Sequence, residues 1–160
     1  QARELVRLAK YPPAGDRGVS TTSAGTDFLL GDDVRQALGE ANKATHLMVM
    51  FESDEGYDAL DAILAVDGVD MVTVGPMDWS VSRGQFGREG ADALSPKIDR
   101  VLSAASEAGR TTTIGGAGKE KAGQYRELGV RVFFVGVDIA LKRKALSETL
   151  ATFRDALSAG

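Results

Sequence analysis

Two acidic residues directly follow two predicted strands, and of all residues in this chain they are the best suited to chemistry. Glu52 comes after the apolar run 47–51, and Asp78 comes after the apolar run 71–76, 26 positions further along the chain. Parallel strands deliver their last residues to one edge of a sheet, so we expect the two carboxylates side by side. Paired carboxylate oxygens can hold Mg²⁺ or Mn²⁺ and leave positions open for a substrate.

The residues around Asp78 strengthen this hypothesis. Gly75 and Pro76 predict a tight turn that exposes the backbone N–H groups near Met77 and Asp78. Such amides can bind a substrate carboxylate beside a cation. The alternative is that each acid is a helix cap or an ordinary loop charge. Trp79, the only tryptophan, is expected to pack beneath the loop.

The elements that must position these residues alternate along the chain. Apolar stretches predict strands at 46–52, 69–75, 111–115 and 130–136. Helices are predicted at 2–10, from 32 or 33 to 42, and at 55–67, 94–108, 118–128 and 139–157. Strands this apolar are typical of a sheet that is covered on both faces. Four successive strand–helix units predict an α/β fold with a parallel sheet, either doubly wound or part of a (βα)₈ barrel.

Other candidate residues carry weaker signals. The glycine-rich turn 115–119 lacks the Walker pattern, and a plain turn is favoured over an anion site. His46, the only histidine, starts a strand and so lies away from the acids. Asp138 is expected to cap the last helix. Arg17 could anchor a loop or be solvated, and the basic run 142–144 is expected to face solvent.

Composition excludes several classes of function. The chain has 160 residues, a net charge of −4 and no cysteine. The charge argues against a general nucleic-acid or membrane-surface partner. The missing cysteine excludes disulfides and thiolate nucleophiles, and it suits a cytoplasmic location. No apolar run approaches the roughly 20 residues that a transmembrane helix needs, and the N-terminus lacks the apolar region of a signal peptide.

Several motifs together resemble a known family, the HpcH/HpaI-type class II pyruvate aldolases of the phosphoenolpyruvate/pyruvate superfamily. The motifs occur in the family's order and run through the whole chain. They are Lys10-Tyr11-Pro12-Pro13 with 15–19, Phe51-Glu52-Ser53, the stretch 63–70, Gly75-Pro76-Met77-Asp78-Trp79-Ser80 and Val135-Gly136-Val137-Asp138.

The resemblance implies a (βα)₈ barrel in which Glu52 and Asp78 bind a divalent metal, namely Mg²⁺, Mn²⁺ or Co²⁺. It further implies that the amides of Met77 and Asp78 receive the carboxylate of pyruvate. The reaction would join pyruvate and an aldehyde into a 4-hydroxy-2-oxo acid, or cleave one. Met50 stands where the family often has glutamine, which removes a hydrogen bond near the substrate.

The sheet edge where the predicted strands end has no histidine that could act as a base, and no arginine or lysine directly follows a strand. The family carries its catalytic His and Arg on early strands, so we expect residues 1–160 to form the C-terminal part of the barrel, with the upstream strands absent. A citrate-lyase-like or malyl-CoA-type lyase of the same superfamily would use the same acids. A non-catalytic interaction module is a third hypothesis. The resemblance also implies a homo-oligomer, commonly a hexamer, with residues 139–157 as the contact between subunits.

Overall fold

The central element is a four-stranded parallel sheet with the strand order β1-β2-β3-β4. A computed structural model describes residues 1–20, 24, 33–115 and 119–158. All four predicted strands are confirmed; one has the expected bounds and the other three are slightly shorter than expected. The strands are β1 Met48–Phe51, β2 Met71–Val74, β3 Thr111–Gly115 and β4 Val130–Phe134.

The helices agree with the prediction at five places and differ at three. The expected helix 55–67 is two short helices that break at Ala59, and the turn after β2 is itself helical. A further short helix was not predicted, because six residues hold too little of the helical period to show a pattern. The helices are α1 Ala2–Ala9, α2 Val34–Ala44, α3 Asp54–Asp58, α4 Leu60–Leu64, α5 Pro76–Ser82, α6 Gly87–Asp92, α7 Ser95–Glu107, α8 Lys119–Glu127 and α9 Asp138–Ser158.

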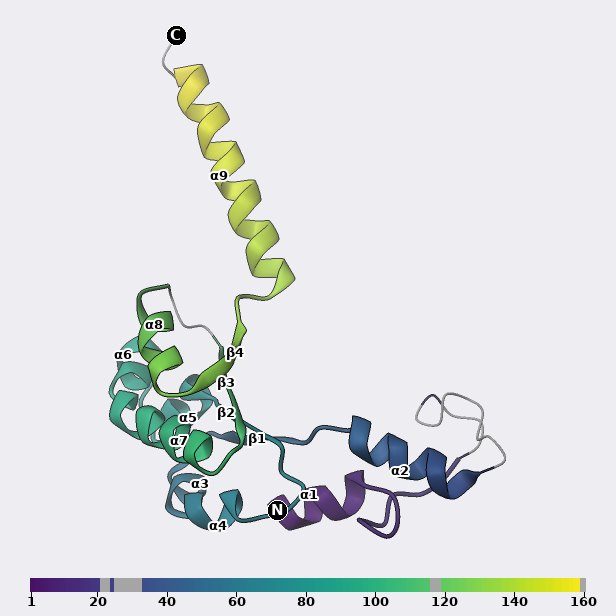
Figure 1. The fold of residues 1–160 in the computed structure, drawn as a ribbon. Helices are drawn as coiled ribbons and strands as arrows, with labels where there is room; N and C mark the ends of the chain where they lie inside the picture. Colours follow the sequence, from purple (N-terminus) through teal and green to yellow (C-terminus); the bar gives the residue numbers. More distant parts are fainter. Residues whose placement is uncertain (21–23, 25–32, 116–118, 159–160) are drawn as a thin grey trace.

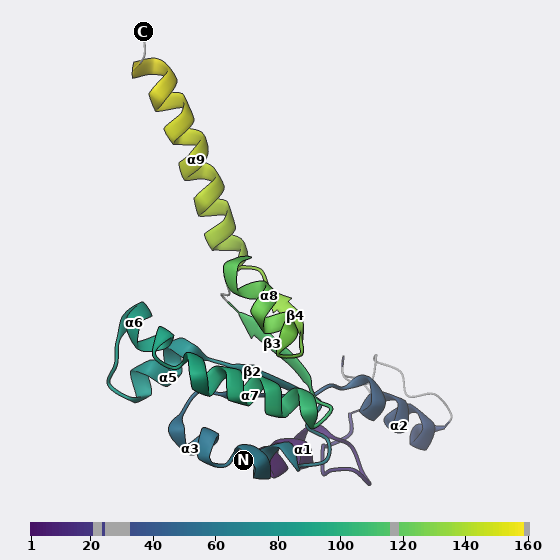
Figure 2. The ribbon, with the colours of Figure 1, turned by 60° about the vertical axis from the view of Figure 1, so that its left-hand side comes forward.

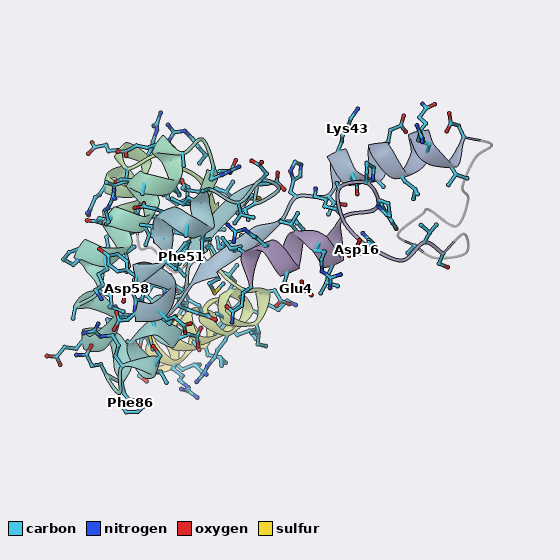
Figure 3. All side chains as sticks on the ribbon, turned by 90° about the horizontal axis from the view of Figure 1, so that it is seen from below. Glu4, Asp16, Lys43, Phe51, Asp58 and Phe86 are labelled. Atoms are coloured by element: carbon cyan, nitrogen blue, oxygen red, sulfur yellow. The ribbon has the colours of Figure 1, made fainter. Side chains whose placement is uncertain are left out.

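The core lies between one face of the sheet and the helices that follow its strands. Figures 1 and 2 show α7 along this face, and α8 lies against β4. Alternate strand residues point toward the helices because successive side chains of a strand face opposite ways. Phe51 and Val72 are buried here against α7 residues such as Val101 and Leu102. Figure 3 places Phe51 inside this layer and Phe86 at the outer edge of the molecule, where Phe86 is exposed.

The opposite face of the sheet is open at its two edge strands. Met48 and Met50 of β1 are exposed, as are Val132 and Phe134 of β4. The expectation from the apolar strands, that both faces are covered, is therefore wrong for the structure of this chain. An open sheet face is instead what a barrel leaves when only some of its strands are present.

Helix α9 extends away from the rest of the chain (Figures 1 and 2). Its residues are exposed along its whole length. Its apolar side chains include a stripe with spacings of seven, four, three and four residues, which is typical of a helix that packs on another helix. The stripe consists of Ile139, Leu146, Leu150, Phe153 and Leu157. Across the ranges that the structure describes, no helix combines the length and apolar character needed to cross a membrane.

Three connections from a helix to the next strand contain a glycine with a positive φ angle. Gly68, Gly109 and Gly129 have φ angles of 90°, 72° and 95°. Residues with a Cβ atom rarely adopt positive φ angles, whereas glycine adopts them without steric cost. Each glycine lets the chain turn sharply from the helical layer back into the sheet.

Candidate active site at the carboxyl edge of the sheet

Glu52 lies one residue beyond β1, at the carboxyl edge of the sheet. Its side chain is exposed, and the next residue, Ser53, caps α3 by accepting a hydrogen bond from Gly56 N at 3.1 Å. The backbone of Gly75 donates to Phe51 O at 3.0 Å, which continues the β1–β2 pairing past the end of β2. Glu52 is therefore fixed between a strand and a capped helix, next to the segment that carries Asp78.

Asp78 is the third residue of α5. The predicted turn is wrong in detail, because Gly75 is the N-cap of this helix and Pro76 occupies its first position. Proline is favoured there, since the first turn of a helix has no internal partner for its N–H groups. The N–H groups of Met77 and Asp78 belong to the same turn and also lack intrahelical acceptors. Asp78 is exposed, and a carboxylate in this position interacts favourably with the helix dipole.

Gly75 brings the two acid-bearing segments into close approach. A Cβ atom at Gly75 would lie 3.0 Å from Met50 Sδ and 3.3 Å from both Cβ and Oε2 of Glu52. The glycine thus leaves room for the Glu52 carboxylate directly over the start of the helix that carries Asp78. The predicted juxtaposition of the two strand ends is present, with Met50 beside them.

The donor set fits a hard divalent cation that keeps open positions. Glu52 and Asp78 supply carboxylate oxygens, which suit Mg²⁺ and Mn²⁺. Among the residues that the structure describes, no cluster of three or more acidic or histidine side chains could enclose a metal ion. Two protein ligands would leave most of an octahedral shell for water and substrate, as is usual for Mg²⁺ sites that bind substrate directly.

A third acid at this edge, Asp54, was not identified from the sequence. Trp79 Nε1 donates to Asp54 Oδ1 at 3.2 Å, and Arg83 Nη1 donates to both Asp54 oxygens at 3.0 and 2.8 Å. Lys97 Nζ of α7 also donates to Asp54 Oδ1. The hydrogen bond from Lys97 holds the pKa of the Asp54 carboxyl below its ordinary value. Asp54 therefore remains an ionised acceptor that joins α3, α5 and α7.

Trp79 packs as predicted, with none of its side chain exposed. Its ring lies 5.7 Å from the Tyr57 ring, measured between centroids, at an angle of 44°. Lys97 Nζ lies 4.8 Å from the Tyr57 centroid and 5.6 Å from the Trp79 centroid, within reach of a cation–π interaction. The indole is thus held on its face by a ring and a cation, and at its N–H by Asp54.

The remaining candidates lie elsewhere. His46 is exposed just before β1, at the opposite end of the strand from Glu52. Arg17 stacks over Tyr11 at 4.7 Å, which favours the loop-anchoring interpretation. Asp138 is the first residue of α9 rather than its N-cap, and its side chain accepts from Ile139 N at 2.8 Å. The basic run 142–144 is exposed, as expected. The glycine-rich turn falls largely on residues 116–118, outside the described residues.

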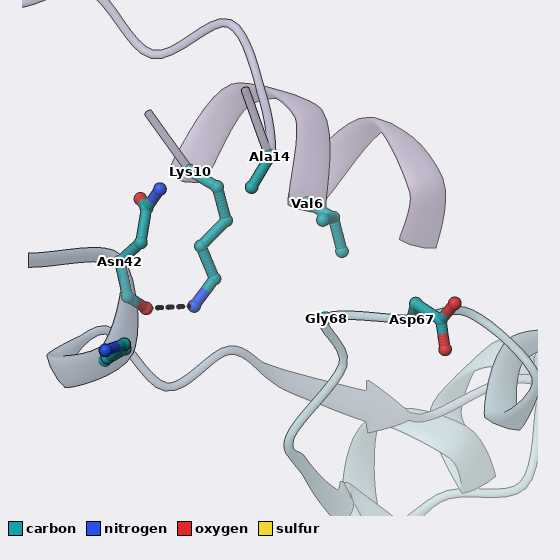
Figure 4. A pocket seen from close by; sticks show the side chains of 7 residues that line it. Val6, Lys10, Ala14, Asn42, Asp67 and Gly68 are labelled. Atoms are coloured by element: carbon teal, nitrogen blue, oxygen red, sulfur yellow. Dashed lines mark hydrogen bonds between the residues drawn. The ribbon is translucent and has the colours of Figure 1, made fainter. Parts of the chain in front are cut away.

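A cavity of about 400 Å³ lies near the start of β2, at the amino end of the sheet, whereas the acids lie at the carboxyl end (Figure 4). Its lining includes Val6 and Lys10 of the N-terminal segment and the turn at Asp67 and Gly68. Lys10 is buried and donates to Asn42 O at 2.7 Å and to Thr45 O. These bonds satisfy the ammonium group with backbone carbonyls, so the lysine stabilises the join between α1 and α2.

Parallel βα units that present paired acids at the carboxyl edge of the sheet place this chain in the (βα)-barrel class of α/β proteins. The chain belongs to the HpcH/HpaI aldolase/citrate lyase family, whose sequence model matches residues 1–145. The family membership and the α/β fold expected from the sequence are both confirmed, and the four units correspond to part of a (βα)₈ barrel.

The relatives named here are all longer than this chain. A hydroxypyruvate/pyruvate aldolase from Roseovarius nubinhibens is 34% identical over 154 residues, which are 96% of this chain and 59% of that protein. A 5-keto-4-deoxy-D-glucarate aldolase from Shigella boydii is 31% identical over the same shares. The solved HpcH/HpaI aldolase from Desulfitobacterium hafniense superposes with a TM-score of 0.83 at 31% identity, covering 95% of this chain and 58% of its own. The chain thus spans less than two thirds of these relatives.

Proposed function

We propose that this chain provides the metal-binding part of a divalent-metal-dependent aldolase that makes or cleaves 4-hydroxy-2-oxo acids. The substrates would be pyruvate or another 2-oxo acid together with an aldehyde. One observation carries the proposal: Glu52 and the helix of Asp78 meet at Gly75, on the carboxyl edge of a parallel sheet. The family and the names of the relatives, which are pyruvate-type and keto-deoxy-glucarate aldolases, support it.

Glu52 and Asp78 are the proposed metal ligands, each supplying an anionic oxygen from the end of its own strand unit. A divalent cation bound there would supply Lewis-acid chemistry, which polarises the keto group of a 2-oxo acid. Mg²⁺, Mn²⁺ and Co²⁺ are all compatible with two carboxylate ligands. The exposure of both acids leaves a substrate free to approach them from solvent.

The first turn of α5 is the proposed binding place for the substrate carboxylate. The amides of Met77 and Asp78 would donate to it, and the helix dipole would add to the attraction. Met50, half exposed beside Gly75, would contact the substrate through its thioether rather than donate a hydrogen bond. The glutamine that the family often has at this position would donate such a bond. Its replacement by Met50 would favour 2-oxo acids that need no hydrogen bond from a side-chain amide there.

The proposal assigns no general base among the residues that the structure describes, because His46 lies at the wrong end of β1. We further propose that residues 1–160 form the C-terminal part of the barrel. The proposed protein is cytoplasmic, has no nucleic-acid or membrane partner, and forms a homo-oligomer such as a hexamer. The exposed apolar stripe of α9 supports a contact between copies of the chain.

The test is metal-dependent exchange of the pyruvate methyl protons for deuterium, followed by NMR in D₂O with MnCl₂. Glu52→Ala and Asp78→Ala should abolish both the exchange and Mn²⁺ binding measured by calorimetry. Glu55→Ala is the matched control, because Glu55 is an exposed acid in the first turn of α3, three residues past Glu52. Full activity in either site variant would contradict the proposal and favour a module without catalysis.

The family description also includes citrate lyases, which keeps a second candidate open. A lyase of the citrate or malyl-CoA type would use the same acids on a thioester substrate. Malyl-CoA cleavage that depends on Glu52 and Asp78, in the absence of pyruvate exchange, would favour this second candidate.

A further inference from the structure

The hydrogen bond between Trp79 and Asp54 joins the segments that carry the two proposed metal ligands. Asp54 is two residues beyond Glu52, and Trp79 directly follows Asp78. The bond from Trp79 Nε1 to Asp54 Oδ1 measures 3.2 Å and spans 25 residues of sequence. A short covalent path therefore leads from each end of this bond to one of the ligands.

We propose that Asp54 and Trp79 are positioning residues that fix the separation of Glu52 and Asp78, and thereby set the affinity of this edge for a divalent cation. The inference rests on the proposed function, since it assumes that the two acids bind a metal. Groups that orient ligands from behind commonly change metal affinity by about 10- to 100-fold when they are removed.

The indole is well suited to this role because it is closely packed on all sides. Its side chain is fully buried, and Tyr57 and Lys97 both pack against its ring. A large side chain in a close-packed environment occupies a single rotamer. Asp78 directly precedes Trp79 in the chain. The anchored indole therefore holds the start of α5 in one place relative to α3.

The Asp54 side chain is fixed from several directions. Arg83 of α5 donates to both of its oxygens, and Lys97 of α7 donates to Oδ1. The Asp54 side chain remains 44% exposed, so its removal opens no large buried cavity. The two cations also occupy its oxygens, so we assign Asp54 no role as a metal ligand.

The first measurement is calorimetric titration of the full 160-residue chain with MnCl₂ alone. Trp79→Phe keeps an aromatic ring and removes the N–H donor, while Asp54→Ala removes the acceptor. Each should weaken Mn²⁺ binding by about 10-fold. The double variant should weaken binding no further than Asp54→Ala alone, because that change already removes the acceptor of the indole N–H. The far-UV circular dichroism of all three should match that of the starting protein.

The matched control is Asp61→Ala. Asp61 of α4 also pairs with a cation of α7, Arg100 at 4.0 Å, but this pair is exposed and has no path to the ligands. Its removal should leave Mn²⁺ affinity unchanged. A purely structural role for Asp54 would lower the urea midpoint while leaving the Mn²⁺ affinity of the folded protein intact, so that result would overturn the inference. Absence of Mn²⁺ binding in the starting protein would instead overturn the proposed function, and additive losses in the double variant would overturn the shared link.

Discussion

Gly129 and Gly109 offer a controlled measurement of how tightly α7 packs against the turn into β4. Both glycines end a helix with a positive φ, 95° at Gly129 and 72° at Gly109. A Cβ at Gly109 would have no neighbour within 4 Å. A Cβ at Gly129 would lie 2.5 Å from Ser106 Cβ on α7, and closer still to Ser106 Oγ.

The two alanine variants should therefore differ by a steric cost. An alanine in the left-handed region costs about 1–2 kcal/mol, and this is the whole expected loss for Gly109→Ala. Gly129→Ala adds an overpacking cost of about 1–3 kcal/mol, because backbone and Cβ atoms cannot rotate out of contact. The expected total for Gly129→Ala is about 2–5 kcal/mol, a large part of the stability of a typical domain.

Urea unfolding gives the free energies, with the fluorescence of Trp79 as the signal. Trp79 is the only tryptophan and is fully buried, so its emission should shift to longer wavelength on unfolding. Ser106→Gly in the Gly129→Ala background removes both clashing atoms and leaves the Ser106 Cα at 4.0 Å. This second change should recover most of the steric loss, less about 1 kcal/mol for glycine within a helix. Equal losses for Gly129→Ala and Gly109→Ala would refute the close packing of this turn.

Further predictions concern the site, the core and α9. Gly75→Ala should weaken Mn²⁺ binding, because its methyl group would crowd the side chains of Met50 and Glu52. Gly115→Ala is the control, because its new contacts would be no shorter than 3.6 Å, and equal Mn²⁺ affinities of the two variants would contradict the close approach of Gly75 to Glu52. Leu102→Ala, at a fully buried position of α7, should lower the free energy of unfolding by about 2–5 kcal/mol, and a loss below 1 kcal/mol would contradict its place in the core. Leu150→Glu on the apolar stripe should lower the mass measured by light scattering, while Ser147→Glu, off the stripe, should not; an unchanged mass in both would remove α9 as the contact.

The sheet could be predicted from the sequence because its signals are local. Each strand is a short apolar run bounded by turn residues, and the acids that matter stand directly at two strand ends. The order of elements then implied a parallel sheet, and the parallel sheet brought Glu52 and Asp78 to one edge. These steps need no knowledge of side-chain packing.

The Asp54 cluster could not be predicted because its members are distant in sequence. Trp79, Arg83 and Lys97 lie 25, 29 and 43 residues from Asp54. Their meeting depends on where α5 and α7 sit over the sheet, and α5 itself is too short to show a helical period. The undivided helix predicted at 55–67 was wrong for a related reason, since apolar spacing alone does not reveal a break at Ala59.

The simple strand order of the sheet also has a consequence for how the chain folds. Each strand pairs with the next one in sequence, and the paired residues Met48–Met71, Met71–Thr111 and Thr112–Val130 enclose loops of 23, 40 and 18 residues. Closing the 40-residue loop costs about 0.7 kcal/mol more chain entropy than closing the 18-residue loop. Contacts this local favour fast assembly, so each unit can dock on its predecessor as the ribosome releases it. The β2–β3 pairing closes the longest loop, which contains α5, α6 and α7, so it is expected to form more slowly than the β1–β2 pairing that brings the two acid-bearing strand ends to one edge.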